Sequence, residues 1–195
     1  VVRPSFVAHR ASPGQRELIV DPGRAFGTGG HASTRLALEW VDALAATGAG
    51  LRGARVLDVG TGSGVLALAA LALGADRAVG FDLDAVAVRE ASTVASRNAL
   101  AGRLDLFTGG IEALSDARFD LVLANLLRSE MLPIAEAIAD CVAPGGGLVL
   151  SGLLEADRPP VVEAFERLGL AMRGERSVCD ATGDRWIAPR LVRAV

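Results

Sequence analysis

The stretch that decides the fold reads Val56-Leu57-Asp58-Val59-Gly60-Thr61-Gly62-Ser63-Gly64, and the apolar run VLALAALALGA follows it over residues 65–75. Residues 56–59 form a short and mostly apolar run, which is typical of a buried strand. The three glycines predict a tight turn, and the apolar run predicts a buried helix, since it has about half of the ~20 residues that a bilayer requires. A strand, a glycine turn and a helix in this order indicate the first unit of a doubly wound α/β sheet.

The same alternation continues outward from this unit. Apolar runs predict further strands at residues 78–82, 104–108, 119–124 and 147–151, and helical spacing predicts helices that start at residue 34 and that cover 85–99, 131–142 and 161–168. Two more strands, at 170–178 and 185–192, would close the sheet as a hairpin. We therefore predict a doubly wound, mostly parallel seven-stranded sheet with helices on both faces and an antiparallel strand at one edge.

Length and charge limit the classes of protein that need to be considered. The chain has 195 residues, 51% of them hydrophobic, with 20 basic residues against 23 acidic ones. Every basic residue is arginine, which excludes a catalytic lysine, and the arginines are scattered from Arg3 to Arg193. A nucleic-acid-binding domain usually has a clustered basic excess, so we expect no direct nucleic-acid partner.

The two cysteines, Cys141 and Cys179, have no neighbouring cysteine or histidine at metal-ligand spacing, so we expect neither a disulfide framework nor a metal site. No basic-then-apolar leader is visible at the start of the sequence, although a trimmed amino terminus would hide one. We expect a cytoplasmic protein without membrane contact. Residues 1–33 are rich in proline and glycine and are predicted to form a leading segment and a glycine-rich loop, followed by one domain over 34–195.

The glycine turn limits the choice of cofactor. A dinucleotide-binding turn needs a third glycine at position 65, where this chain has Val65, and a phosphate-binding Walker loop needs a lysine. Amide groups at a helix start also bind carboxylates, and S-adenosylmethionine carries one. Asp82 lies 22 residues after Gly60, where an acid can accept both ribose hydroxyls, and Asp58 is placed to meet the cofactor's amino group. The alternative is that the glycines only turn the chain and that Asp82 caps the next helix.

Asn125 follows the fourth predicted strand, at the same edge of the sheet as the glycine turn. Its side-chain carbonyl could hold an amine in line with a sulfonium methyl group, which would make Asn125 the catalytic residue of a methyl transfer. Such a direct displacement depends on positioning more than on acid or base strength. The alternative is that Asn125 is a turn or cap residue.

Together these motifs resemble the PrmA family. The resemblance rests on DPGxAFGTGGHAST at residues 21–34, VLDVGTGSG at 56–64, DLD at 82–84, ANLL at 124–127 and SGLL at 151–154. This family has a class I methyltransferase fold and methylates ribosomal protein L-eleven on lysine side chains and on the terminal amine, using S-adenosylmethionine. The resemblance implies cofactor contacts at Thr34, Gly60, Asp82 and Asn125, with Gly62 and Asp58 beside them.

The resemblance also bears on the loop before the first helix and on the substrate. The loop over residues 26–34 would cover the cofactor, and we expect His31 to orient or cap that helix rather than to act as a general base.

Members that act on the ribosomal protein carry a separate amino-terminal domain that presents it, and this sequence begins where that domain would end. A ribosomal protein is thus the expected acceptor, the alternatives being another protein or a small amine or hydroxyl compound. An inactive, cofactor-binding regulatory module is a third hypothesis.

Overall fold

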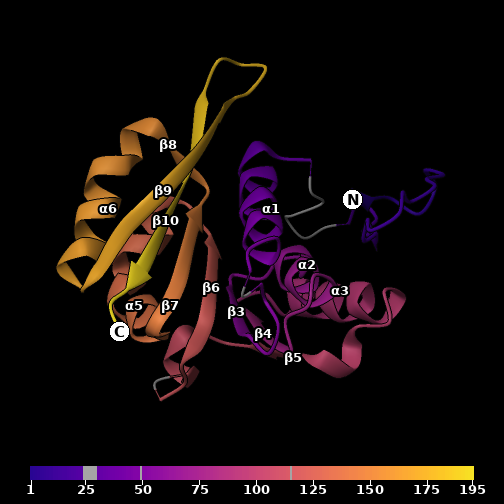
Figure 1. Ribbon diagram of the computed structural model, residues 1–195, viewed down its shortest axis with the longest axis horizontal. Coiled ribbons are helices and arrows are strands. Elements are labelled where there is room, and N and C mark those ends of the chain that lie inside the picture. Colours follow the sequence, from indigo (N-terminus) through magenta and orange to yellow (C-terminus); the bar gives the residue numbers. More distant parts are fainter. Residues whose placement is uncertain (24–29, 49, 115) are drawn as a thin grey trace.

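The computed structural model describes residues 1–23, 30–48, 50–114 and 116–195 (Figure 1). The strands are β1 (Val2–Arg3), β2 (Leu18–Ile19), β3 (Arg55–Val59), β4 (Arg77–Asp82), β5 (Leu104–Thr108), β6 (Phe119–Asn125), β7 (Val142–Ser151), β8 (Leu153–Leu154), β9 (Leu170–Cys179) and β10 (Arg185–Arg193). The α-helices are α1 (Ala32–Ala45), α2 (Val65–Ala72), α3 (Ala85–Arg97), α4 (Arg128–Met131), α5 (Ala135–Asp140) and α6 (Arg158–Arg167).

The main sheet has the order β5-β4-β3-β6-β7-β10, and β9 pairs with the far side of β10. Neighbours from β5 to β7 are parallel, whereas β10 is antiparallel to both β7 and β9. All seven predicted strands are present, which confirms the doubly wound, mixed sheet. The antiparallel strand β10 lies one position in from the edge, because β9 covers it.

Three differences from the prediction lie near β7. The strand begins at Val142 instead of at the predicted residue 147, and residues 143–146 form an irregularity inside it opposite β6. The two-residue strand β8 continues β7 after Gly152, whose φ of +82° bends the chain, and it pairs with the start of β10. The single helix predicted over 131–142 is replaced by α4, a 3-10 turn at Leu132–Ile134 and α5, because Pro133 interrupts the regular hydrogen-bonding pattern.

Helices cover both faces of the sheet, with α1, α2 and α3 on one face and α5 and α6 on the other (Figure 1). Successive residues of the central strand β6 belong to opposite layers of the core. Leu121 and Leu123 belong to the core layer that includes residues of α1 and α2, whereas Val122 belongs to the layer that includes Ile138 of α5 and Phe165 of α6. Both faces of β6 are therefore apolar, as expected for a strand buried between two helix layers.

The leading segment contributes to this core although its sequence shows little periodicity. Strands β1 and β2 form a small parallel pair, and Leu18 and Val20 are buried beside α2. Asn98, at the end of α3, holds β2 from the side: its Oδ1 accepts from the Ile19 N–H at 2.8 Å and its Nδ2 donates to the Ile19 carbonyl at 2.9 Å. No helix in the described part of the chain is long and apolar enough to cross a membrane.

Candidate active site

A cavity of about 920 Å³ opens at the carboxyl ends of β3, β4 and β6. Its walls come from the start of α1, the glycine turn after β3, the loops after β4 and β6, and the start of β10. This is the edge at which doubly wound sheets bind ligands, and the volume lies toward the upper end of the range for ligand sites. The sequence-predicted residues Thr34, Asp58, Gly60, Gly62, Asp82 and Asn125 all line it.

The glycine turn has a backbone that other residues adopt only with strain. Gly60, Gly62 and Gly64 have φ angles of +66°, +52° and +79°. A Cβ at Gly60 would stand 2.6 Å from the Leu126 side chain, so this glycine also allows a close approach of the loop after β6. Gly64, directly before α2, has no side chain to cap the helix, so the first two amide groups of α2 have no partner within the helix, whereas the third, that of Ala67, donates to Asp58.

The Asp82 carboxylate joins the glycine turn to the end of β4. Its Oδ2 accepts from the Gly62 N–H at 3.0 Å, and its Oδ1 accepts from the Asp84 N–H at 3.0 Å. Capping of α3 belongs instead to Asp84, which accepts from the Val86 N–H at 2.7 Å, so the alternative role of Asp82 as the helix cap is wrong. A carboxylate has about four acceptor positions, so Asp82 still has capacity for two ribose hydroxyls.

Asp58 lies beneath the turn and is only 2% exposed. Its Oδ2 accepts from Thr61 Oγ1 at 2.8 Å and from the Ala67 N–H at 3.2 Å, so it fastens the turn to α2. Burial raises the pKa of Asp58 to about 7, the two hydrogen bonds oppose that shift, and the nearby charge of Asp82 adds to it. Asp58 therefore has a structural role in addition to the cofactor contact that the sequence predicts.

Asn125 and Thr34 come together from positions 91 residues apart. Asn125 Nδ2 donates to Thr34 Oγ1 at 3.3 Å, and Thr34 is fully buried at the start of α1. Asn125 Oδ1 is buried and has no hydrogen-bond partner within the described chain. An unpaired buried carbonyl is costly, and this one belongs to a residue that lines the cavity.

The start of α1 is fixed on the sheet by hydrogen bonds from both sides. His31 Nδ1 accepts from the Ser33 N–H at 3.3 Å and lies 2.8 Å from Ser33 Oγ, so His31 caps α1, which confirms the expected capping role. Ser151 Oγ, at the end of β7, donates to the Ser33 carbonyl at 2.8 Å. The predicted cofactor-covering loop over 26–34 lies outside the described residues as far as position 29.

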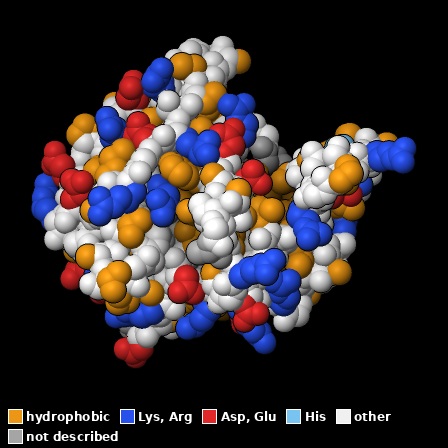
Figure 2. Space-filling view, in the orientation of Figure 1, with side chains coloured by type: hydrophobic (Ala, Val, Ile, Leu, Met, Phe, Trp, Pro, Cys, Tyr) orange, Lys and Arg blue, Asp and Glu red, His pale blue; other side chains and the backbone are white. Residues whose placement is uncertain are grey.

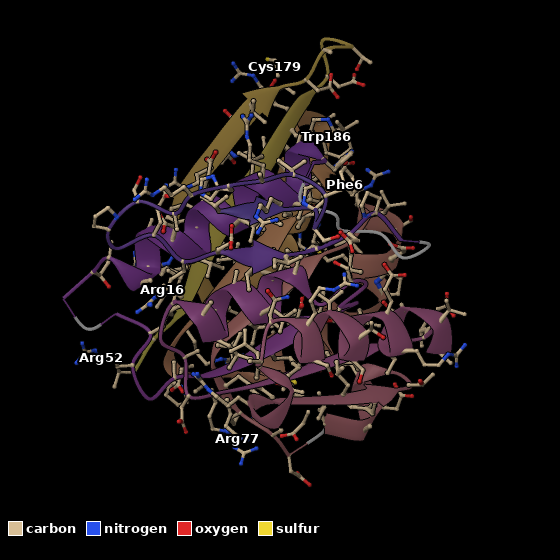
Figure 3. All side chains as sticks on the ribbon, turned by 90° about the vertical axis from the view of Figure 1, so that its right-hand side faces the viewer. Phe6, Arg16, Arg52, Arg77, Cys179 and Trp186 are labelled. Atoms are coloured by element: carbon tan, nitrogen blue, oxygen red, sulfur yellow. The ribbon has the colours of Figure 1, made fainter. Side chains whose placement is uncertain are left out.

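Trp186 is a cavity residue that the sequence reasoning missed. It lies near the start of β10, and because β10 is antiparallel to its neighbours, this start reaches the same edge as the ends of the parallel strands. Figure 3 shows Trp186 at the hairpin end of the molecule and Arg77, at the start of β4, at the opposite end. The predicted hairpin was a signal that could have placed Trp186 here.

The charges that line the cavity are acidic. Five carboxyl groups contribute to its wall, and no arginine does so among the described residues; the five are Asp58, Asp82, Asp84, Glu112 and Glu130. On the outer face shown in Figure 2, by contrast, arginines alternate with acidic side chains. The lining therefore favours a ligand with positive charge.

Comparisons with known proteins agree on one family. The family model described as ribosomal protein L11 methyltransferase (PrmA) matches residues 1–179. The ribosomal protein L11 methyltransferase of Sorangium cellulosum is 41% identical over 189 residues, which cover 90% of this chain and 58% of that protein. The ribosomal protein L11 methyltransferase of Geobacter sulfurreducens is 44% identical over 172 residues, which cover 88% of this chain and 54% of that protein. The chain thus spans little more than half the length of these relatives.

Solved structures agree with the fold. The crystal structure of ribosomal protein L11 methylase from Lactobacillus delbrueckii subsp. bulgaricus has a TM-score of 0.83 at 26% identity and covers 96% of this chain and 91% of that chain. Magnesium protoporphyrin IX methyltransferase from Synechocystis PCC 6803 has a TM-score of 0.66 at 20% identity, and the match covers 89% of this chain and 86% of that chain. Both likenesses confirm the predicted class I methyltransferase fold.

Proposed function

Because the chain belongs to the PrmA family of ribosomal protein L11 methyltransferases, we propose that it transfers a methyl group from S-adenosylmethionine to an amine of that ribosomal protein. The observation that carries the proposal is the buried, unpaired Oδ1 of Asn125 at the edge of a cavity that also contains the glycine turn and Asp82. The role of each site residue is part of this proposal. A ribosomal-protein acceptor also implies a cytoplasmic location.

The residues present fit S-adenosylmethionine. Asp82 retains acceptor capacity for the ribose hydroxyls, and the first two amide groups of α2, which precede the one held by Asp58, can serve a carboxylate. Gly60 and Gly62 let the backbone approach a ligand closely, since neither has a side chain. When bound, the cofactor supplies a methyl group on a sulfonium, which an amine nitrogen can take as the bond to sulfur breaks.

Asn125 would orient the acceptor amine. Its Oδ1 accepts one N–H of the neutral amine, which directs the nitrogen lone pair toward the methyl group. Thr34 keeps the amide from rotating, because its Oγ1 accepts from Nδ2 at 3.3 Å. As the nitrogen–carbon bond forms, the amine becomes positively charged, and it then loses a proton to solvent. The acidic lining stabilises that charge.

The test is a methyl-transfer assay with purified ribosomal protein L11 and cofactor labelled in its methyl group. We expect wild-type protein to label the substrate and Asn125→Ala to lower kcat by about 100-fold, since a mispositioned nucleophile loses roughly that factor. Calorimetry with the cofactor on the same samples shows whether the variant still has an intact binding site.

Three results would contradict parts of the proposal. Unchanged turnover in Asn125→Ala would remove the positioning role of Asn125. Labelling of small amines or of another protein, but not of L11, would replace the proposed acceptor. Cofactor binding without turnover on any acceptor would favour a regulatory module.

A further inference from the structure

Arginines gather on the two strands of the β9–β10 hairpin, away from the cavity. Together β9 and β10 carry five arginines and one acidic residue, Glu175, although the whole chain has a net charge of −3. Glu175 is already paired with Arg158 of α6, at 2.9 Å. The hairpin strands therefore carry a positive excess, and none of their five arginines belongs to the cavity wall.

Arg190 lies in the middle of β10 and its charge is not balanced. It pairs with Val149 of β7, which belongs to the core layer that includes residues of α1, so Arg190 lies on the face of the sheet that α1 covers. Its Nε is buried without an acceptor, and its guanidinium has no ion pair within the part of the chain that the structure describes. A charged group that loses water without gaining a partner is costly.

A β-bulge brings a second arginine to the same place. Arg190 pairs with Gly174 and the next residue, Leu191, pairs with Met172, so Arg173 is an extra residue in β9. Such bulges redirect side chains. Burial, and after it the like charge of Arg173, lowers the pKa of Arg190, which indicates that the two guanidinium groups lie close together. An anion between them would offset their repulsion.

The surroundings of this pair are rigid. The Trp40 indole of α1 donates from Nε1 to the Ala188 carbonyl at 2.8 Å, and a Cβ at Gly174 would stand 3.0 Å from its ring, so the ring packs directly on β9. Arg176 lies over the same ring, 4.8 Å from its centroid, and its Nη1 is 3.5 Å from a Glu39 oxygen. Glu39 is thus already engaged with another arginine.

We propose that Arg173 and Arg190 form a binding site for a phosphate group, separate from the cavity. Guanidinium groups match phosphate oxygens in geometry, and two of them balance a dianion. The bulge interrupts the regular edge of β9, so a single group fits this place better than an added strand. The inference does not depend on the methyl-transfer activity. The competing explanation is that the stem of Arg190 only covers apolar surface while its head reaches water.

The test uses inorganic phosphate as the probe. S-adenosylhomocysteine is added first, because the free amide groups at the start of α2 could also bind phosphate. Nitrogen-15 NMR follows the arginine Nε–H signals, and loss of one signal in Arg190→Gln assigns that of Arg190. This Nε–H is buried and so protected from exchange with water. We expect phosphate to shift it with a Kd of about 1–10 mM at near-physiological salt.

Matched variants separate binding from a general effect of charge. Arg173→Gln should weaken phosphate binding by about 10-fold while the Arg190 signal remains, because one of two charge-assisted contacts is lost. Arg173 is exposed, so this variant should fold normally. Arg52→Gln removes the same charge from an exposed turn before β3, three strand positions from β10, and should leave the affinity unchanged. Arg190→Lys, followed by phosphorus-31 linewidths, should give an intermediate loss.

Two results would overturn the inference. One is an Arg190 Nε–H signal that does not move up to about 50 mM phosphate, which would mean an adventitious ion only. The other is equal affinity in Arg173→Gln and Arg52→Gln. Phenyl phosphate identifies the source of the group. Binding at least as tight as that of phosphate would assign the site to phosphate monoesters, and binding of inorganic phosphate alone would assign it to the free ion.

Discussion

Asp58 and Asp82 lie at the carboxyl ends of β3 and β4, which are neighbouring parallel strands of the sheet, yet the surroundings of the two carboxylates differ. Asp58 is buried beneath the turn and donors meet one of its oxygens, whereas Asp82 receives a backbone N–H on each oxygen and faces the cavity. The sequence identified both residues because acids at strand ends of a doubly wound sheet converge on one edge. It assigned them different cofactor contacts, but it could not predict that Asp58 is buried beneath the turn and fastens it to α2, because burial and hydrogen bonding depend on packing.

Two features of the site that the sequence did not predict, the contact between Thr34 and Asn125 and the position of Trp186, have a common cause. Thr34 and Asn125 are 91 residues apart, and Trp186 reaches the cavity only because β10 runs against its neighbours. A local pattern predicts the type of an element and the edge at which it ends. It does not predict which side chains from distant elements touch, since this depends on the final packing of α1 and the hairpin.

We expect Asp82→Ala to weaken cofactor binding by about 1–3 kcal/mol, because charge-assisted hydrogen bonds to the ribose would be lost. Calorimetric titration with S-adenosylhomocysteine measures the change. Asp82→Asn is the matched control: its amide oxygen can keep one N–H bond while the charge is removed, so an intermediate loss is expected. Unchanged affinity in the alanine variant would disprove the ribose assignment.

Asp58 should give the folding stability a pH dependence. Its folded pKa is about 7 against an ordinary value of 3.8, so between these values the folded state holds more protons than the unfolded state. Its contribution is present below about pH 4 and is lost as the pH rises through about 7. We expect Asp58→Asn to become more stable relative to wild type between about pH 5 and about pH 8, measured by urea unfolding. An unchanged slope in Asp58→Asn would show that another group titrates.

At the scale of elements, the strands were predicted closely and the breaks between them less well. Strand β5 has the predicted bounds, because an apolar run between polar residues is a local signal. The bend between β7 and β8 was not predicted. It depends on the close approach of the loop after β6, which donates the Leu126 N–H to the Ser151 carbonyl at 3.1 Å.

Gly152 is the residue that permits this approach, so we expect Gly152→Ala to disturb the site. Its φ is +82°, and an added Cβ would stand 2.5 Å from the Leu126 carbonyl oxygen. We expect a loss of about 2–4 kcal/mol in stability and a lower kcat, because Leu126 would shift Asn125. Gly169→Ala is the matched control, since its φ is +83° and no atom lies within 4 Å. Equal losses in both variants would show that backbone strain alone matters.

At the scale of the whole molecule, the leading segment is part of the same core as the helices. Arg97 of α3 donates to Asp21 at 2.6 Å, and Asn98 binds both polar groups of Ile19. The sequence predicted an irregular segment here because two-residue strands leave no periodic signal. The contacts that order it come from the end of α3, about 80 residues later.

We expect Asn98→Ala to destabilise the fold by about 1–3 kcal/mol, because the polar groups of Ile19 would lose their partners. Hydrogen exchange at the Ile19 amide should accelerate more than at β6 amides. Ser96→Ala is the control, since the Ser96 hydroxyl donates to the Ser92 carbonyl of its own helix. Unchanged exchange at Ile19 would mean that burial of Leu18 and Val20 alone orders the segment.

The hydrogen bonds of Asp82 also limit how this site could be redesigned for synthetic cofactor analogues. With the ribose bound at Asp82 as proposed, a smaller residue at position 82 would make room for a bulky ribose substituent, but it would also release the Gly62 and Asp84 amides that shape the turn. Leu83 also lines the cavity and is 80% exposed, and its apolar side chain cannot hold a backbone amide as Asp82 does. Libraries intended to accept enlarged analogues are therefore better started at Leu83, with Asp82 kept.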